Sequence, residues 1–119
     1  MTTTPVKMSY EDVFCINFVS KLGGTATAVA GETDVYLMGK VILEDGTEIL
    51  VDKKHDETNR MSRTAEYEYM KYIYPRQFFG VPEGDTMVEM YFWFENIDGT
   101  KVEDAAGNLY AVAQTGTLL

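Results

Sequence analysis

Residues 88–95, VEMYFWFE, decide the fold of this chain. They combine aromatic and β-branched side chains, which favour a strand over a helix. Because alternate side chains of a strand point to opposite faces, the segment has two faces of different character. One face carries only apolar residues, namely Val88, Met90, Phe92 and Phe94. We expect this face to lie in the core of the protein.

The opposite face of the same segment carries Glu89, Tyr91, Trp93 and Glu95. The two glutamates indicate that it meets water, because unpaired carboxylates are rarely buried completely. Tyr91 and Trp93 would then be exposed rings about 7 Å apart. Such rings form a platform for a sugar or a partner protein, with Glu89, Glu95 and the nearby Asp98 as hydrogen-bond acceptors. In the alternative, the chain's own arm or loop covers Trp93.

Short alternating stretches extend along the chain on both sides of this segment. With the segment itself, they are residues 13–19, 34–43, 48–52, 64–75 (which Pro75 ends), 86–95, 101–104 and 108–113. Turn signals separate them, including the Asp-Gly pairs at 45–46 and 98–99, which favour tight hairpin turns. About seven to eight short strands with regularly spaced turns are typical of an all-β protein. The sequence therefore predicts an immunoglobulin-like antiparallel β-sandwich.

The remaining segments define the domain organisation. Residues 1–12 are polar with few apolar anchors, so we expect an extended N-terminal arm followed by a single domain over 13–119. Residues 25–31 predict either a short strand or a loop. Residues 52–63 have no periodic pattern and predict a mobile loop. Gly39 lies inside a predicted strand, which indicates a bulge or a close backbone approach.

Composition and charge narrow the range of functions. The chain has 119 residues, 24% of them charged, and a net charge of −9. This charge disfavours nucleic acid and anionic membranes as partners, because both bind clustered Lys and Arg. No apolar run is long enough for membrane insertion. With one cysteine, Cys15, and one histidine, His55, the sequence offers no internal disulfide and no zinc pattern. It singles out no catalytic residue, metal site or cofactor, so we expect a protein that is not an enzyme.

Residues 74–112, YPRQFFGVPEGDTMVEMYFWFENIDGTKVEDAAGNLYAV, resemble immunoglobulin-like domains in surface glycan-utilisation proteins of gut Bacteroidetes, including starch-binding types. The resemblance implies that Phe92 and Phe94 point inward. It also implies a turn built by Asn96, Asp98 and Gly99, and a loop built by Gly80, Pro82 and Gly84. Where those domains often carry tryptophans, residues 52–61 read DKKHDETNRM. The resemblance therefore does not extend to sugar binding by that loop.

The N-terminus bears on where the protein works. Domains of the resembling kind are usually exported, but this chain begins with Met1 and shows no secretory signal there. Immunoglobulin-like domains also reach the outside of a cell without secretion, as parts of bacteriophage virions. We therefore expect a non-enzymatic decoration protein on the capsid, tail or fibre of a virion, in contact with protein neighbours. The alternative is a glycan-binding accessory module on a bacterial cell surface, with a polysaccharide as its partner.

Overall fold

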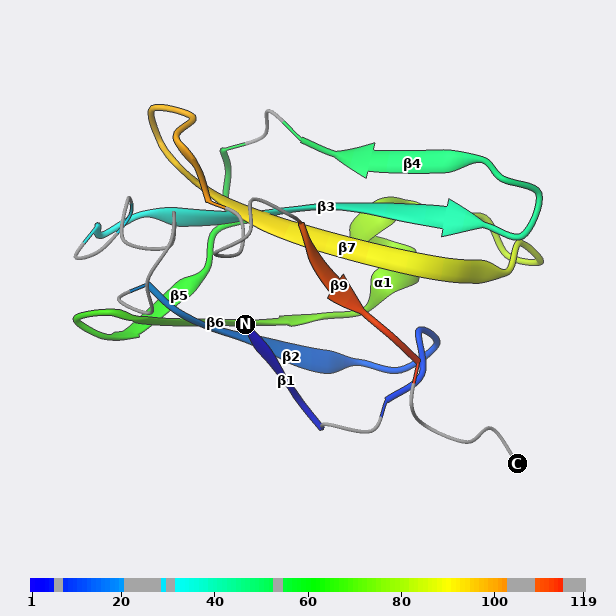
Figure 1. Ribbon diagram of the computed structural model, residues 1–119, viewed down its shortest axis with the longest axis horizontal. Coiled ribbons are helices and arrows are strands. Elements are labelled where there is room, and N and C mark those ends of the chain that lie inside the picture. Colours follow the sequence, from blue (N-terminus) through cyan, green and yellow to red (C-terminus); the bar gives the residue numbers. More distant parts are fainter. Residues whose placement is uncertain (6–7, 21–28, 30–31, 53–54, 103–108, 115–119) are drawn as a thin grey trace.

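A computed structural model describes residues 1–5, 8–20, 29, 32–52, 55–102 and 109–114 of the chain. Within this part, nine strands and one short helix fold into two packed layers (Figure 1). The elements are β1 (Thr2–Thr4), β2 (Phe14–Val19), β3 (Val35–Leu43), β4 (Glu48–Val51), β5 (Ser62–Ala65), β6 (Glu68–Ile73), α1 (Pro75–Phe79), β7 (Met87–Asn96), β8 (Lys101–Val102) and β9 (Tyr110–Val112). No helix of the described part is long and apolar enough to cross a membrane. The prediction for residues 25–31 falls outside the described residues, apart from Val29, which is buried.

Both layers are antiparallel sheets. The first has the order β1-β2-β6-β5, and the second has the order β4-β3-β7-β8, with β9 also paired to β7. Because β3 occupies one edge of β7 along its length, β8 and β9 follow one another along the other edge. When β1 to β8 are lettered along the chain as A, B, C, C′, D, E, F and G, the first sheet has the order A-B-E-D and the second has the order C′-C-F-G. These are the two sheets of immunoglobulin domains. The predicted immunoglobulin-like sandwich is confirmed. The expected count of about seven to eight strands becomes nine in the described residues, because β8 and β9 share one position.

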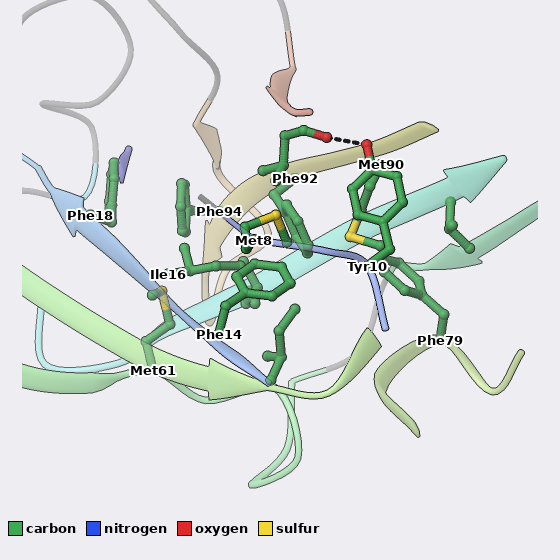
Figure 2. Close-up of a cluster of buried hydrophobic side chains, with 14 of the residues drawn as sticks. Met8, Tyr10, Phe14, Ile16, Phe18, Met61, Phe79, Met90, Phe92 and Phe94 are labelled. Carbon is green, nitrogen blue, oxygen red and sulfur yellow. Dashed lines mark hydrogen bonds between the residues drawn. The ribbon is translucent and has the colours of Figure 1, made fainter. Parts of the chain in front are cut away.

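The core lies between the two sheets and is built mainly by β2, β3 and β7. Phe14, Ile16 and Phe18 of β2 share one cluster with Phe92 and Phe94 of β7, and each of the five is at most 1% exposed (Figure 2). Burying a large apolar side chain stabilises a fold by roughly 1.5–3 kcal/mol. The inward direction predicted for Phe92 and Phe94 is therefore confirmed, and these rings are a main source of stability.

β7 departs from strict alternation near its start. Its pairing with β3 shifts between Ile42 and Leu43, which lie opposite Glu89 and Met87 respectively. Val88 is the extra residue of this bulge and is 44% exposed, whereas Met87 is 2% exposed. The expectation that Val88 lies in the core is wrong. The extra residue of the bulge breaks the alternation, so Val88 points outward and Met87 points inward, the opposite of what strict alternation predicts.

The N-terminal segment packs on its own domain. β1 pairs with β2 at the edge of the first sheet. Met8 and Tyr10 are buried in the core, and the Tyr10 hydroxyl donates a hydrogen bond to the carbonyl oxygen of Val112 (Figure 2). The described residues of the segment 1–12 thus pack on the first sheet and in the core.

An ion pair fastens the same segment to the helix. The Arg76 guanidinium donates two hydrogen bonds of 2.7 Å to the Glu11 carboxylate. It also donates bonds of 2.8 Å to the carbonyl oxygens of Pro82 and Asp85. Arg76 therefore links the N-terminal segment, α1 and the loop before β7 through a single planar group, a geometry that Arg provides and Lys does not.

The tyrosine-rich residues 64–75 belong to two strands and a helix rather than to one strand. β5 ends at Ala65, the chain turns, and β6 begins at Glu68. Pro75 begins α1, where its fixed φ and missing N–H suit the first turn of a helix. The prediction of a single strand that ends at Pro75 is therefore wrong, although strand is the correct conformation for most of the segment.

α1 packs on β3 and β4 at one end of the sandwich (Figure 1). A Cβ atom added at Gly39 of β3 would lie 2.9 Å from Cζ of Phe79, which belongs to α1. It would also lie 3.0 Å from Phe92 Cδ1 and 3.0 Å from the carbonyl oxygen of Tyr91. The contact with the Tyr91 carbonyl oxygen confirms the close approach predicted at Gly39. The pairing of β3 with β7 is regular at Gly39, so no bulge lies there.

The described residues of the segment 52–63, which are 52 and 55–63, include several that bond to the backbone of β3. The Leu37 N–H donates to the Asn59 carbonyl at 2.8 Å, and the Asn59 side-chain amide donates to the Leu37 carbonyl at 3.2 Å. The Met61 N–H donates to the Val35 carbonyl at 2.8 Å. The chain thus follows the edge of β3 before it crosses to the other sheet as β5. These bonds attach the described residues to β3, and the mobility of the segment stays a prediction.

Candidate functional site

The structure places the predicted site on the outer face of the β4-β3-β7 sheet but does not leave its central ring open. Glu89 is exposed and Tyr91 is half-buried. Trp93 is only 6% exposed and Glu95 only 9% exposed. The expectation that both rings stand in water is therefore wrong for Trp93, and the expectation of an exposed carboxylate is wrong for Glu95.

A small apolar cluster explains this burial. Tyr36 and Met38 of β3 pack beside Trp93 on the outer face, and Leu109 packs against them. The Tyr36 ring also meets the His55 ring edge to face, with 5.0 Å between centroids. The Lys101 ammonium lies 5.1 Å from the centre of a Trp93 ring, where a cation–π attraction is favourable. We call Tyr36, Met38, Trp93 and Leu109 the outer cluster.

Hydrogen bonds complete the cover over Trp93. The indole N–H of Trp93 donates to Glu95 Oε2 at 3.0 Å. The other carboxylate oxygen of Glu95 lies 3.2 Å from His55 Nε2. Glu95 can be buried because both of its oxygens have partners, which removes most of the cost of taking a carboxylate out of water. Of the two arrangements that the sequence left open for Trp93, the cover by the chain's own loop is the one observed.

The other predicted residues are dispersed. The Tyr91 hydroxyl lies 3.3 Å from Glu89 Oε1, and the Lys40 ammonium lies 5.3 Å from the centre of the Tyr91 ring. Asp98 lies in the turn after β7, where its backbone N–H donates to Asn96 Oδ1 at 3.0 Å. The five predicted residues therefore do not converge on one concave site.

The exposed rings of this protein lie on the other sheet. Tyr72 of β6 is 65% exposed, and Tyr74, two residues further on, is 38% exposed. The register that pairs Phe14 with Ile73 brings Val13, which is 59% exposed, next to Tyr74. We call Val13, Tyr72 and Tyr74 the tyrosine face. It is an apolar surface on the outside of the β1-β2-β6-β5 sheet.

A groove of about 360 Å³ adjoins the tyrosine face. Its walls come from β6, the end of β4, α1 and the loop before β5, and they include Val51, Thr58, Asn59, Lys71, Tyr72, Ile73, Tyr74, Gln77 and Phe78. Four separate segments thus meet at one edge of the sandwich. A concave site that combines aromatic and polar groups is the form that ligand sites usually take.

The polar groups of the groove differ in their freedom to bind. The Asn59 side-chain amide already donates a hydrogen bond to the Leu37 carbonyl. Gln77, in contrast, is exposed to solvent. The Lys71 ammonium donates to the Arg60 carbonyl at 3.3 Å. Burial lowers the pKa of Lys71, and the charge of Glu57 acts in the opposite direction. The groove therefore offers an amide, an ammonium and two phenol rings to a ligand.

Comparison with known families finds one family whose model covers β1 to β8. A family model described as "Domain of unknown function (DUF8578)" matches residues 1–102. The chain belongs to the DUF8578 family. The match includes β1, the groove and the β7–β8 hairpin, so it contains the tyrosine face and all of the outer cluster except Leu109. No curated protein matches the chain.

The outward direction of Tyr72 and Tyr74 in this DUF8578 domain is indicated by the sequence, although it is not among the predictions above. Once residues 68–73 are taken as a strand, alternation places Tyr72 and Tyr74 on the face opposite Tyr69 and Ile73. Tyr69 and Ile73 are buried at 1% and 4% exposure, so the other face must be outward.

Across the described residues, no group of three or more His, Cys, Asp or Glu side chains is placed to hold a metal ion.

Proposed function

We propose that this DUF8578 domain is a non-catalytic carbohydrate-binding module and that its ligand lies across the tyrosine face and the groove. The observation that supports this proposal is the pair of exposed rings, Tyr72 and Tyr74, beside a groove with hydrogen-bonding groups. The apolar C–H face of a sugar packs on aromatic rings, and its hydroxyls bond to amides, phenols and ammonium groups.

The position of the rings supports the same function. β6 is paired to β2 over six residues, so the strand that carries Tyr72 is held inside a sheet rather than in a loop. Tyr74 lies directly before α1, whose Phe79 packs in the core. A ligand would then meet rings that are already in place, which reduces the entropy lost on binding.

Affinity electrophoresis tests this proposal with a panel of soluble polysaccharides that includes starch, xylan, β-glucan, pectin and alginate. We expect at least one polysaccharide to retard the domain, and the variants Tyr72→Ala and Tyr74→Ala to lose most of the retardation. Tyr91→Ala is the matched control, because it removes a tyrosine from the opposite sheet. Mobility unaffected by every polysaccharide, or full retardation of both tyrosine variants, would contradict the proposal.

A second candidate is a structural role as a decoration protein of a larger assembly, on the capsid, tail or fibre of a bacteriophage virion. It is favoured by β4, which pairs only with β3 in the described residues and exposes Leu50 by 52%. An unpaired strand edge with an apolar side chain is a surface on which a neighbouring protein can add a strand. Antibody against the domain should then detect it in gradient-purified particles from source cells after lysis. Detection confined to the soluble fraction would count against this role.

A further inference from the structure

We propose that the carbohydrate held by the groove is acidic, with a sugar carboxylate bound by Lys71. This inference rests on the proposed function and narrows its ligand to glycans that contain uronic acids. Its basis is a contrast in charge: the chain has 19 acidic and 10 basic residues, yet among the described residues that line the groove Lys71 alone is charged. Lys71 thus brings a positive charge to the groove of an acidic protein.

The end of β5 places the Lys71 ammonium in the groove. β5 pairs with β6 only as far as Met70, which lies opposite Ser62. Beyond that point the edge of β6 faces the groove, and Lys71 is half-buried there. The Lys71 ammonium donates one hydrogen bond there, to the Arg60 carbonyl at 3.3 Å. An ammonium has three donors, so the geometry leaves donors for a ligand.

The surroundings of Lys71 favour an anion over a neutral hydroxyl. Burial lowers the pKa of Lys71, so its charge is partly deprived of water. Glu57 opposes this effect, but Glu57 also lies 3.4 Å from the Arg60 guanidinium, with which it forms an ion pair. A ligand carboxylate would restore a counter-charge to Lys71, and charge-assisted hydrogen bonds are roughly twice as strong as neutral ones.

The overall charge restricts the kind of anion. With a net charge of −9, the protein repels dense polyanions such as nucleic acid at a distance. In a uronic-acid glycan, each carboxylate is separated from the next by a sugar ring. Lys71 and the two tyrosines line the same groove from opposite faces of the free edge of β6, so a sugar that packs on the rings can present its carboxylate to Lys71 across that edge.

Isothermal titration with matched oligosaccharides tests the inference. The probes are oligogalacturonate, alginate and hyaluronan oligosaccharides, each paired with its carboxyl-reduced neutral form. We expect at least one acidic member to bind about tenfold more tightly than its neutral form. Lys71→Gln should bring the affinity for the acidic form down to that for the neutral form, and Lys71→Arg should retain most of the preference; an undiminished preference in Lys71→Gln would overturn the inference. Backbone amide spectra of both variants check that they fold.

The outcomes separate this inference from the proposed function. Equal affinity for the acidic and neutral members, or binding of neutral polysaccharides alone, overturns the role of Lys71 but leaves a carbohydrate-binding module. Absence of binding to any carbohydrate overturns both. An acidic peptide, oligoglutamate, is the control for a protein ligand. If it shifts the amide signals of Lys71 and Tyr72 and the acidic sugars do not, the groove binds a peptide and the inference is wrong.

Discussion

The rings of Phe18 and Phe94 are stacked across the two sheets of the sandwich, with 3.9 Å between centroids and 11° between planes. Phe18 belongs to β2 and Phe94 to β7, the strands at the B and F positions of an immunoglobulin domain. Antibody domains join these two strands by a disulfide. This chain has a single cysteine, so the aromatic stack is the corresponding link between the sheets.

The stack predicts a large effect of truncation. Phe94→Ala should lower the free energy of unfolding by about 3–5 kcal/mol, because it leaves a cavity beside Phe18 in a core that is otherwise filled. Phe94→Leu should cost less, since it keeps most of the volume. Urea unfolding followed by the fluorescence of Trp93, the single tryptophan, measures both losses. A Phe94→Ala variant as stable as the unchanged protein would contradict the importance of the stack.

Gly39 predicts an effect of enlargement rather than truncation. Gly39→Ala places a methyl group 2.9 Å from Phe79 Cζ, which forces α1 or the Phe79 side chain to move. We expect a loss of about 1–3 kcal/mol in the free energy of unfolding. In a double-mutant cycle, Phe79→Leu should recover part of this loss.

Gly46 provides the matched control for this cycle. It has a φ of +89° and no atom within 4 Å of an added Cβ, so Gly46→Ala acts through backbone strain alone. Phe79→Leu should therefore leave the cost of Gly46→Ala unchanged. If it rescues both glycine variants equally, the close contact at Gly39 is not the cause of the instability.

The fold was predictable because its determinants are local. Alternation identified the core rings Phe92 and Phe94, and Asp-Gly pairs identified turns in which Gly46 and Gly99 have φ of 89° and 83°. The bulge at Val88 was not predictable in the same way. One extra residue leaves no mark on composition, and its position depends on how β7 pairs with β3.

The candidate site was less predictable because its geometry is not local. Trp93 is covered through a contact between His55 and Glu95, which are 40 residues apart in the chain. No periodic pattern within β7 reveals a cover that comes from another segment. Tyr72 and Tyr74 were accessible to the alternation argument, but the groove beside them was not, because separate segments form its walls.

Two buried tyrosines predict a loss of stability at alkaline pH. Burial raises the pKa of Tyr10 and that of Tyr69 above the usual value. The unfolded chain therefore loses these protons first, near pH 10. The stability that the protonated hydroxyls contribute is fully present below about pH 10 and is lost as the pH rises through the higher folded-state values.

Thermal unfolding between pH 7 and pH 11 measures this loss. We expect a nearly constant Tm up to about pH 9 and a fall above about pH 10. Tyr10→Phe should make the fall less steep, because phenylalanine has no proton to lose. Tyr72→Phe, at a residue that is 65% exposed, is the control and should leave the slope unchanged. A Tm that stays constant to pH 11 would show that the buried hydroxyls do not govern alkaline stability.

The cover over Trp93 gives the last prediction, and the single tryptophan makes it directly measurable. His55→Ala removes the ring that contacts Tyr36 and bonds to Glu95, so Trp93 should gain contact with water. Its emission should move to longer wavelength, and acrylamide should quench it more strongly. Glu57→Ala is the control, because its side chain, 87% exposed, lies in the same loop. An emission spectrum of His55→Ala that matches that of Glu57→Ala would mean that the outer cluster, and not His55, keeps water from the indole.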